Sequence, residues 1–152
     1  MFTNFRVFPY VGVGPIYFGM NRDQLHAILG IPDSSKNSRF GPKVIDYWHS
    51  NDITITFSAV DGTALEIGFG YAQMTAEVEG IKLFERSGPE VYRDLCLLDG
   101  YPREDVGFTV LFKFGITLDG FLISDQEQRV VTVFSRGVWR EYDPKLLPVK
   151  IT

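Results

Sequence analysis

Few side chains in this sequence of 152 residues could carry acid–base, nucleophilic or metal chemistry. His26 and His49 are the two histidines, and neither belongs to a metal-ligand pattern such as His-x3-His or Cys-x2-Cys. Cys96 is the one cysteine, and a cysteine among leucines, as in Leu95-Cys96-Leu97-Leu98, is typically a small buried hydrophobe. We therefore predict no catalytic residue, no metal site and no cofactor, and expect a protein that is not an enzyme.

The glycine pairs and carboxylate pairs do not change this expectation. Gly12-Val-Gly14 and Gly68-Phe-Gly70 lack the Lys and Ser/Thr that complete a phosphate loop, so close strand approach or a bulge explains them better. Neighbouring acidic residues such as Glu104 and Asp105 are typical of solvated turns. An enzymatic or small-molecule site stays open as a hypothesis, and it requires a pocket with convergent polar groups.

A short helix is predicted between Asn21 and Gly30. Asn21 can serve as the N-cap and Gln24 as its capping-box partner, while Gly30 can take a left-handed conformation before Pro32. The apolar stripe consists of Leu25, Ile28 and Leu29. A helix of about nine residues is not stable alone in water, so it must pack on a sheet.

The residues that follow predict that sheet. A polar loop is expected from Ser34 to Arg39, and strands are expected over Val44–Trp48 and Ile53–Ser58, with a hairpin turn at Asp61-Gly62. In the next run Leu65, Ile67 and Phe69 share one face, and Ala64, Glu66 and Gly68 share the other. Strands with one apolar and one polar face indicate an antiparallel sheet covered on one side.

The second half of the chain has a similar pattern. Ser87 and Glu90 form a second predicted capping box with Pro89 in the first turn, and Gly100 closes the helix. The strands expected after it are Val106–Phe112, Phe114–Leu118, Phe121–Ile123 and Arg129–Phe134, with an edge segment at Val138–Tyr142 before Pro144 and Pro148 end the regular structure.

These patterns predict an α+β fold built from two similar strand–helix–antiparallel-sheet repeats, each with a short helix packed on a meander sheet. We place the repeats at residues 1–73 and 74–152, within one compact unit. The alternative is a single α+β domain whose two helices merely look alike.

Composition excludes several classes of protein. The chain has 15 Lys+Arg and 19 Asp+Glu, a net charge of -4, which argues against general nucleic-acid binding. Its 45% hydrophobic content is too high for a disordered chain, and no stretch approaches the ~18 apolar residues of a membrane helix. The N-terminus has no secretory signal pattern, and a single cysteine fits a reducing compartment, so we expect a cytoplasmic protein.

The helix borders carry a family resemblance. The run Ile16-Tyr-Phe-Gly-Met-Asn21, followed by Leu29-Gly-Ile-Pro32, resembles the start of repeats in the β-lactamase-inhibitor-protein-like fold and in small outer-membrane-assembly lipoproteins. The stretches Gly80–Phe84 and Val131–Phe134 are similar to bacterial proteins of this size. Some proteins of this build resemble immunity proteins against polymorphic toxins. This chain lacks the lipidated N-terminal cysteine of the lipoproteins.

Charge and aromatic content suggest a surface for a protein partner. Residues 77–105 contain eight acidic and four basic side chains, which would steer a basic partner if they share a surface. Exposed Tyr and Trp are frequent hot-spot residues at interfaces. The candidate partner-binding residues are Tyr47, Trp48, Glu66, Tyr71, Glu77, Glu79, Glu90, Asp94, Asp99, Glu104 and Asp105.

From the charge clustering and the resemblance, we expect a non-enzymatic immunity protein that occludes a cognate toxin, such as a nuclease with a basic active site. The alternative is an assembly module that binds an extended peptide by strand addition to a sheet edge. The sequence specifies neither the partner nor the oligomeric state.

Overall fold

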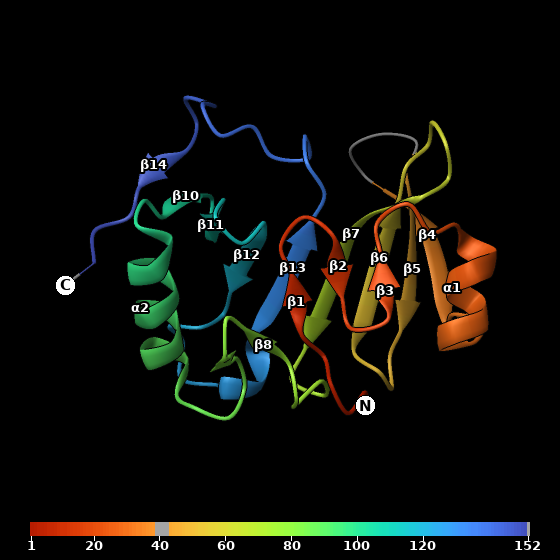
Figure 1. Cartoon of the computed structure of the whole chain (residues 1–152), viewed down its shortest axis with the longest axis horizontal. Helices are drawn as coiled ribbons and strands as arrows, with labels where there is room; N and C mark the ends of the chain where they lie inside the picture. Colours follow the sequence, from red (N-terminus) through yellow and green to blue (C-terminus); the bar gives the residue numbers. More distant parts are fainter. Residues whose placement is uncertain (39–42, 152) are drawn as a thin grey trace.

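The computed structural model describes residues 1–38 and 43–151 and has an α+β fold (Figure 1). Its helices are α1 (Arg22–Leu29), α2 (Gly88–Asp99) and a short 3-10 helix, Gln126–Gln128. The strands are β1 (Val7–Phe8), β2 (Gly12–Val13), β3 (Ile16–Tyr17), β4 (Ser34–Asn37), β5 (Val44–Trp48), β6 (Ile53–Phe57), β7 (Ala64–Gly70), β8 (Glu77–Val78), β9 (Ile81–Lys82), β10 (Arg103–Asp105), β11 (Phe108–Leu111), β12 (Ile116–Asp119), β13 (Val130–Phe134) and β14 (Leu147–Pro148). Within the described residues, neither helix has the length and apolar content needed to span a membrane.

Nine strands form one antiparallel sheet in the order β14-β10-β11-β12-β13-β7-β6-β5-β4. The four strands that follow α1 make up one half of this sheet, and β10–β13, which follow α2, lie in the other half. The halves meet where β7 pairs with β13, from Glu66–Phe134 to Gly70–Val130. Figure 1 shows α1 and α2 at opposite ends of the sheet, with β1–β3 between them.

Both helices begin at the N-cap residue that the sequence predicts, but only α1 has the predicted reciprocal capping box. Asn21 and Gln24 form the reciprocal capping box of α1, and the Ser87 side chain accepts the Glu90 amide N–H at the start of α2. Gly100 ends α2 in the left-handed conformation. Gly30 differs from the prediction, because its φ of 86° is combined with an extended ψ of -178° that directs the chain toward β4.

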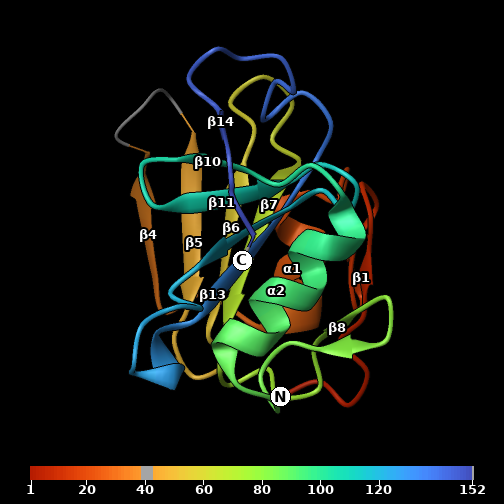
Figure 2. The same ribbon diagram turned by 90° about the vertical axis from the view of Figure 1, so that its left-hand side faces the viewer.

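A single main core lies on one face of the large sheet. Figure 2 shows both helices and β1 on the same side of β4 and β5. Leu25 of α1 and Leu95 of α2 are fully buried there, together with Val13 of the β1–β3 sheet and Val78 of the β8–β9 hairpin. Because these elements all cover one face, the other face is covered only in part by the described residues, by the C-terminal segment and by Tyr10, which packs on Phe134.

The pleat assigns alternate residues to the two faces. The registered row Asp46–Ile55–Ile67–Val133 faces the core, whereas the neighbouring row Tyr47–Thr54–Gly68–Thr132 faces away. Ala64 was predicted on the polar face but is 2% exposed, because a bulge between Thr56 and Phe57 shifts the alternation opposite it.

Three strand predictions were wrong. The polar segment Ser34–Asn37 is not a loop but the fully exposed edge strand β4, while Arg39 of the same prediction lies outside the described residues. Residues 121–123 form no strand, because the backbone of Phe121 packs directly against Gly88 of α2. Residues 138–142 form no strand either: the Glu141 carbonyl accepts a hydrogen bond from the Arg103 guanidinium. The segment that pairs with β10 is instead Leu147–Pro148.

Candidate binding surface

The uncovered sheet face has a polar and aromatic hollow near its centre. Gly68 lies at its base, with Thr54 and Thr132 as its neighbours in register. A Cβ at Gly68 would come within 2.6 Å of the Thr54 Oγ1 atom, so only glycine leaves room for the threonine hydroxyl there. The hollow has a volume of about 250 Å³ and is lined by Ile45, Tyr47, Thr54, Thr56, Glu66, Gly68, Phe108, Thr117, Thr132 and Trp139.

Among the described residues, Glu66 is the one charged residue that lines this hollow. Burial raises the pKa of its carboxyl group, and the charge of Lys43 opposes this only in part. The described residues provide its carboxylate with no hydrogen bond and no ion pair. A carboxylate that is shielded from water without a partner is costly, so a cation that reached it would be bound favourably.

Three aromatic rings of the described chain line the hollow: Tyr47 and Trp139, which are both half-buried, and Phe108, which is exposed. Aromatic faces attract Lys and Arg side chains through their quadrupole. Tyr47 already has the Lys36 ammonium 5.1 Å from its ring centre. The combination of aromatic walls with an unpaired carboxylate is therefore suited to a basic side chain.

The C-terminal segment limits the hollow on one side. Val138 and Trp139 pack against a small cluster of Val110, Phe134 and Leu146, which lies apart from the main core. Arg103 fastens this segment, because its guanidinium donates to the Glu141 carbonyl and lies 3.2 Å from the Glu141 carboxylate. The described chain thus covers part of the open face, and Glu66 and Tyr47 remain half-exposed on it.

The structure brings Tyr47 and Glu66 together but excludes Trp48 from this surface. Consecutive strand residues point to opposite faces, so Trp48 lies in the core with 3% exposure, and its indole N–H donates to the Gly30 carbonyl at 2.9 Å. Its assignment to a partner surface was wrong. Tyr71 is also directed inward, with its ring centre 6.1 Å from that of Phe84.

The predicted acidic residues lie elsewhere and do not form one acidic surface. Glu77 lies between Arg6 and Lys82, 3.0 Å from each, and Arg86 pairs with Glu90 and Asp94 on α2. The other four are distributed over three elements: Glu79 is at the β8–β9 turn, Asp99 is at the end of α2, and Glu104 and Asp105 are on β10. Glu77, Glu90 and Asp94 are thus paired with cations, and Arg6 comes from outside the segment that the sequence count covered.

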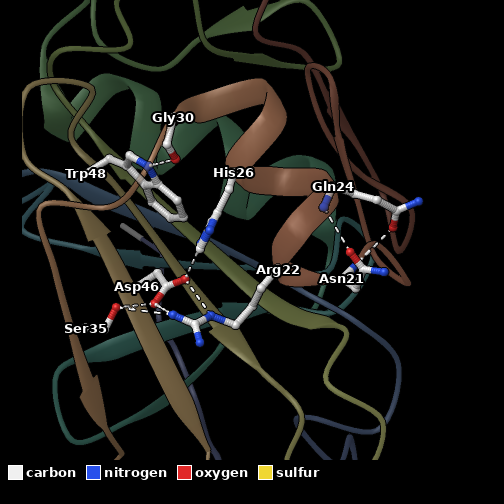
Figure 3. Close-up of polar contacts among 8 residues, drawn as sticks. All are labelled: Asn21, Arg22, Gln24, His26, Gly30, Ser35, Asp46 and Trp48. Atoms are coloured by element: carbon white, nitrogen blue, oxygen red, sulfur yellow. Dashed lines mark hydrogen bonds and ion pairs between the residues drawn. The ribbon is translucent and has the colours of Figure 1, made fainter.

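A buried ionic cluster joins α1 to the other face of the same strands (Figure 3). The Asp46 side chain is fully buried and receives two hydrogen bonds from Arg22, at 3.0 and 2.9 Å. His26 Nε2 lies 3.0 Å from one Asp46 oxygen, and the Ser35 hydroxyl donates to the other at 2.5 Å. Burial acts to raise the pKa of Asp46, but the hydrogen bonds from Arg22, His26 and Ser35 outweigh it and hold the pKa below its ordinary value.

This cluster does not have the geometry of a nucleophilic triad. In a triad the hydroxyl must donate to the histidine, whereas Ser35 donates to Asp46. Asp46, on β5, is instead the shared acceptor for side chains from α1 and β4, and its role is to hold the three elements together. Sequence reasoning missed the cluster, because His26 and Asp46 are 20 positions apart and only the fold brings them together.

Cys96 is expected to be unreactive in the folded protein. Its side chain is fully buried, and burial raises the pKa of the thiol to about 11. At pH 8 about one thiol in a thousand is then ionised, compared with about a quarter for an unperturbed cysteine. Ellman's reagent should detect no thiol in the native protein and one per chain in guanidinium chloride. Rapid native labelling would contradict the burial of α2 against the sheet.

Metal ligation has no support in the described part of the chain, where no three His, Cys, Asp or Glu residues gather into a possible ion site. No family model, curated protein or solved structure matches this chain. The candidate surface must therefore be judged by its own chemistry.

Proposed function

We propose that this protein is a non-enzymatic binding protein that receives a basic side chain of a protein partner on the open face of its sheet. The observation that carries the proposal is Glu66: a half-buried carboxylate without an ion pair among the described residues, in a hollow that Tyr47 and Trp139 also line. A Lys or Arg that entered the hollow would gain an ion pair and aromatic contact together. The threonine hydroxyls around it can bond to the partner's backbone.

The partner that we propose is a basic toxin domain that this protein would occlude as an immunity protein. Two arguments support this: the resemblance described above to immunity proteins, and the net charge of -4, which favours encounter with a basic partner. A rigid sheet can place Glu66 against a cationic active site of the kind that cleaves RNA or DNA. We propose a cytoplasmic location for the same reason, since an immunity protein must meet its toxin inside the cell.

The experiment is co-expression with the products of the two adjacent genes, followed by growth assays and pull-down. If a partner is bound, Glu66→Gln should weaken the affinity by about 30-fold, or about 2 kcal/mol, because it removes the charge but keeps the shape. Binding by the unaltered protein should also weaken as the pH falls below the raised pKa of free Glu66, since protonation removes the charge that the partner needs.

Glu104→Gln is the matched control, because Glu104 is an exposed carboxylate on β10 at a distance from the hollow. It should change the affinity by less than about twofold. If Glu104→Gln weakened binding and Glu66→Gln did not, the partner would be bound on the α2–β10 side and the proposal would be wrong. If the products of the neighbouring genes were neither toxic nor bound by this protein, the proposed immunity function would be wrong.

A second candidate function is strand addition at β4. This strand is one edge of the nine-stranded sheet, and all four of its residues are exposed. An extended peptide could bond to its free backbone groups. A peptide-display screen that enriched alternating apolar residues, with binding lost on Lys36→Pro but retained in Glu66→Gln, would favour this function over the first.

We also propose that the chain consists of two repeats, residues 1–73 and 74–152. The support is topological: each helix follows a short β-hairpin and precedes a four-stranded meander, and the last strands of the two meanders pair at the centre of the sheet. The boundary falls between the end of β7 at Gly70 and the start of β8 at Glu77.

A further inference from the structure

A second and larger hollow lies near the C-terminal end of α2, where the turn at Tyr10 meets the segment after β13. Its volume is about 510 Å³, within the range of small-molecule sites. Three cationic side chains line it, Arg103, Lys113 and Arg136, together with two acidic ones, Asp99 and Glu141. This hollow shares no lining residue with the open-face hollow.

Both acidic side chains are already engaged with donors. The Asp99 carboxylate accepts the backbone N–H of Lys113 at 3.0 Å and that of Tyr101 at 3.2 Å. Glu141 forms the ion pair with Arg103. Neither carboxylate therefore needs a cationic ligand.

The cations, in contrast, keep unused donor capacity. Arg136 is exposed and forms no ion pair with a described residue, although its guanidinium lies 4.1 Å from the centre of the Tyr10 ring. The Lys113 ammonium donates to the Leu98 carbonyl at 3.1 Å and to no carboxylate in the described chain. The Arg103 side chain is 8% exposed, and its buried Nε–H has no acceptor.

The rings around these cations are held firmly. The Arg103 guanidinium lies 4.4 Å from the Phe112 ring centre and 4.8 Å from that of Tyr101. Tyr10 has a φ of 63°, a conformation that non-glycine residues adopt at a cost. Its hydroxyl donates to the Phe112 carbonyl, and its ring lies so close to Gly115 that a Cβ there would be 3.1 Å away. Such strained residues persist where the surroundings fix them, often at ligand sites.

We propose that this hollow binds the phosphate group of a small molecule that also carries a flat ring. Arg136 supplies a planar fork of donors suited to phosphate, and Lys113 adds a second positive charge. Tyr101 is 57% exposed and offers a face on which the ligand's ring can stack.

The test is calorimetric titration with AMP, inorganic phosphate and adenosine. AMP should bind with a Kd below about 1 mM, and more tightly than either fragment. Arg136→Ala should weaken AMP binding by about tenfold or more, because it removes the one exposed guanidinium of the hollow. Arg140→Ala is the matched control, since Arg140 is exposed on the same segment but does not line the hollow, and it should leave the affinity unchanged.

Three results would overturn the proposal: no heat of binding with AMP or phosphate, adenosine binding as tightly as AMP, or equal affinities in Arg136→Ala and Arg140→Ala. If inorganic phosphate bound as tightly as AMP, the ring part of the proposal would be wrong. Thermal melts of both variants show whether they are folded, so that loss of binding is not confused with loss of structure.

Discussion

Asp46→Asn is expected to lower the free energy of unfolding by about 3 kcal/mol, a typical loss of stability when one partner of a buried ion pair is removed. The Asp46 side chain is fully buried and accepts hydrogen bonds from Arg22 and Ser35, with His26 Nε2 within hydrogen-bonding distance, whereas an amide presents one oxygen and two donors. The loss should be near the lower end of the known range, because the Arg22 side chain is 42% exposed and can be hydrated once its partner is gone.

Urea denaturation followed by circular dichroism measures this loss. Asp119→Asn is the control, since Asp119 is an exposed aspartate at the end of β12 whose side chain forms no hydrogen bond with the described residues. It should change the stability by less than about 0.5 kcal/mol. Equal effects of the two variants would show that the cluster of α1, β4 and β5 does not stabilise the fold.

The same cluster should give the protein an acid-sensitive stability. The folded pKa of Asp46 is lower than its unfolded value, so its contribution is fully present above the unfolded pKa of about 3.9. The contribution is then lost as the pH falls through the lower, folded pKa. Asp46→Asn should remove this part of the acid dependence, which a series of melts between neutral and acidic pH would detect.

Trp48→Ala is expected to cost about 3–5 kcal/mol, the typical loss for deleting a large aromatic side chain from a core. Trp48 is 3% exposed and joins β5 to the end of α1 through its hydrogen bond to Gly30. Trp48→Phe should recover most of the loss, since it restores apolar volume and leaves only the exposed Gly30 carbonyl, which water can reach.

Chemical denaturation of both variants, combined with partner pull-down, distinguishes a core role from an interface role. A core role predicts that Trp48→Phe folds and binds the partner normally. A stable Trp48→Ala protein that had lost its partner would show that the indole contacts the partner, as the sequence had suggested, and would contradict the packing described here.

Local sequence signals predicted the helices well because their determinants are local. The capping residues Asn21, Gln24 and Ser87 act within one turn of the positions that they cap, so spacing alone reveals them. The strand β4 was missed because its Ser-Ser-Lys-Asn residues have no strand preference. This edge strand forms through its pairing with β5, which is a tertiary interaction.

The candidate surface was predictable only in part. Tyr47 and Glu66 were both selected from the sequence, but nothing in it indicated that they share one hollow, since 19 positions separate them and the strand register joins them. The sequence analysis predicted that Trp139 belongs to an edge segment over Val138–Tyr142, because the residues around it are typical of strands. Its position beside Glu66 depends on the anchor between Arg103 and Glu141, which spans 38 residues.

The eight-to-four excess of acidic residues in 77–105 illustrates a different limit. A count along the chain gives net charge but no surface, and the fold distributes these residues over β8, α2 and β10 beside Arg6, Lys82 and Arg86. Glu66, a half-buried carboxylate with no ion pair among the described residues, is a stronger physical argument for a basic partner than many solvated carboxylates.

The most direct test of the open-face proposal is site-specific photo-crosslinking in the complex with the partner encoded by an adjacent gene. A photoreactive amino acid at Thr56, which is opposite Glu66 in the register, should crosslink to the partner, and the same amino acid at Glu104 should not. Crosslinking from position 104 but not from position 56 would contradict the proposal that the open face of the sheet is the binding surface.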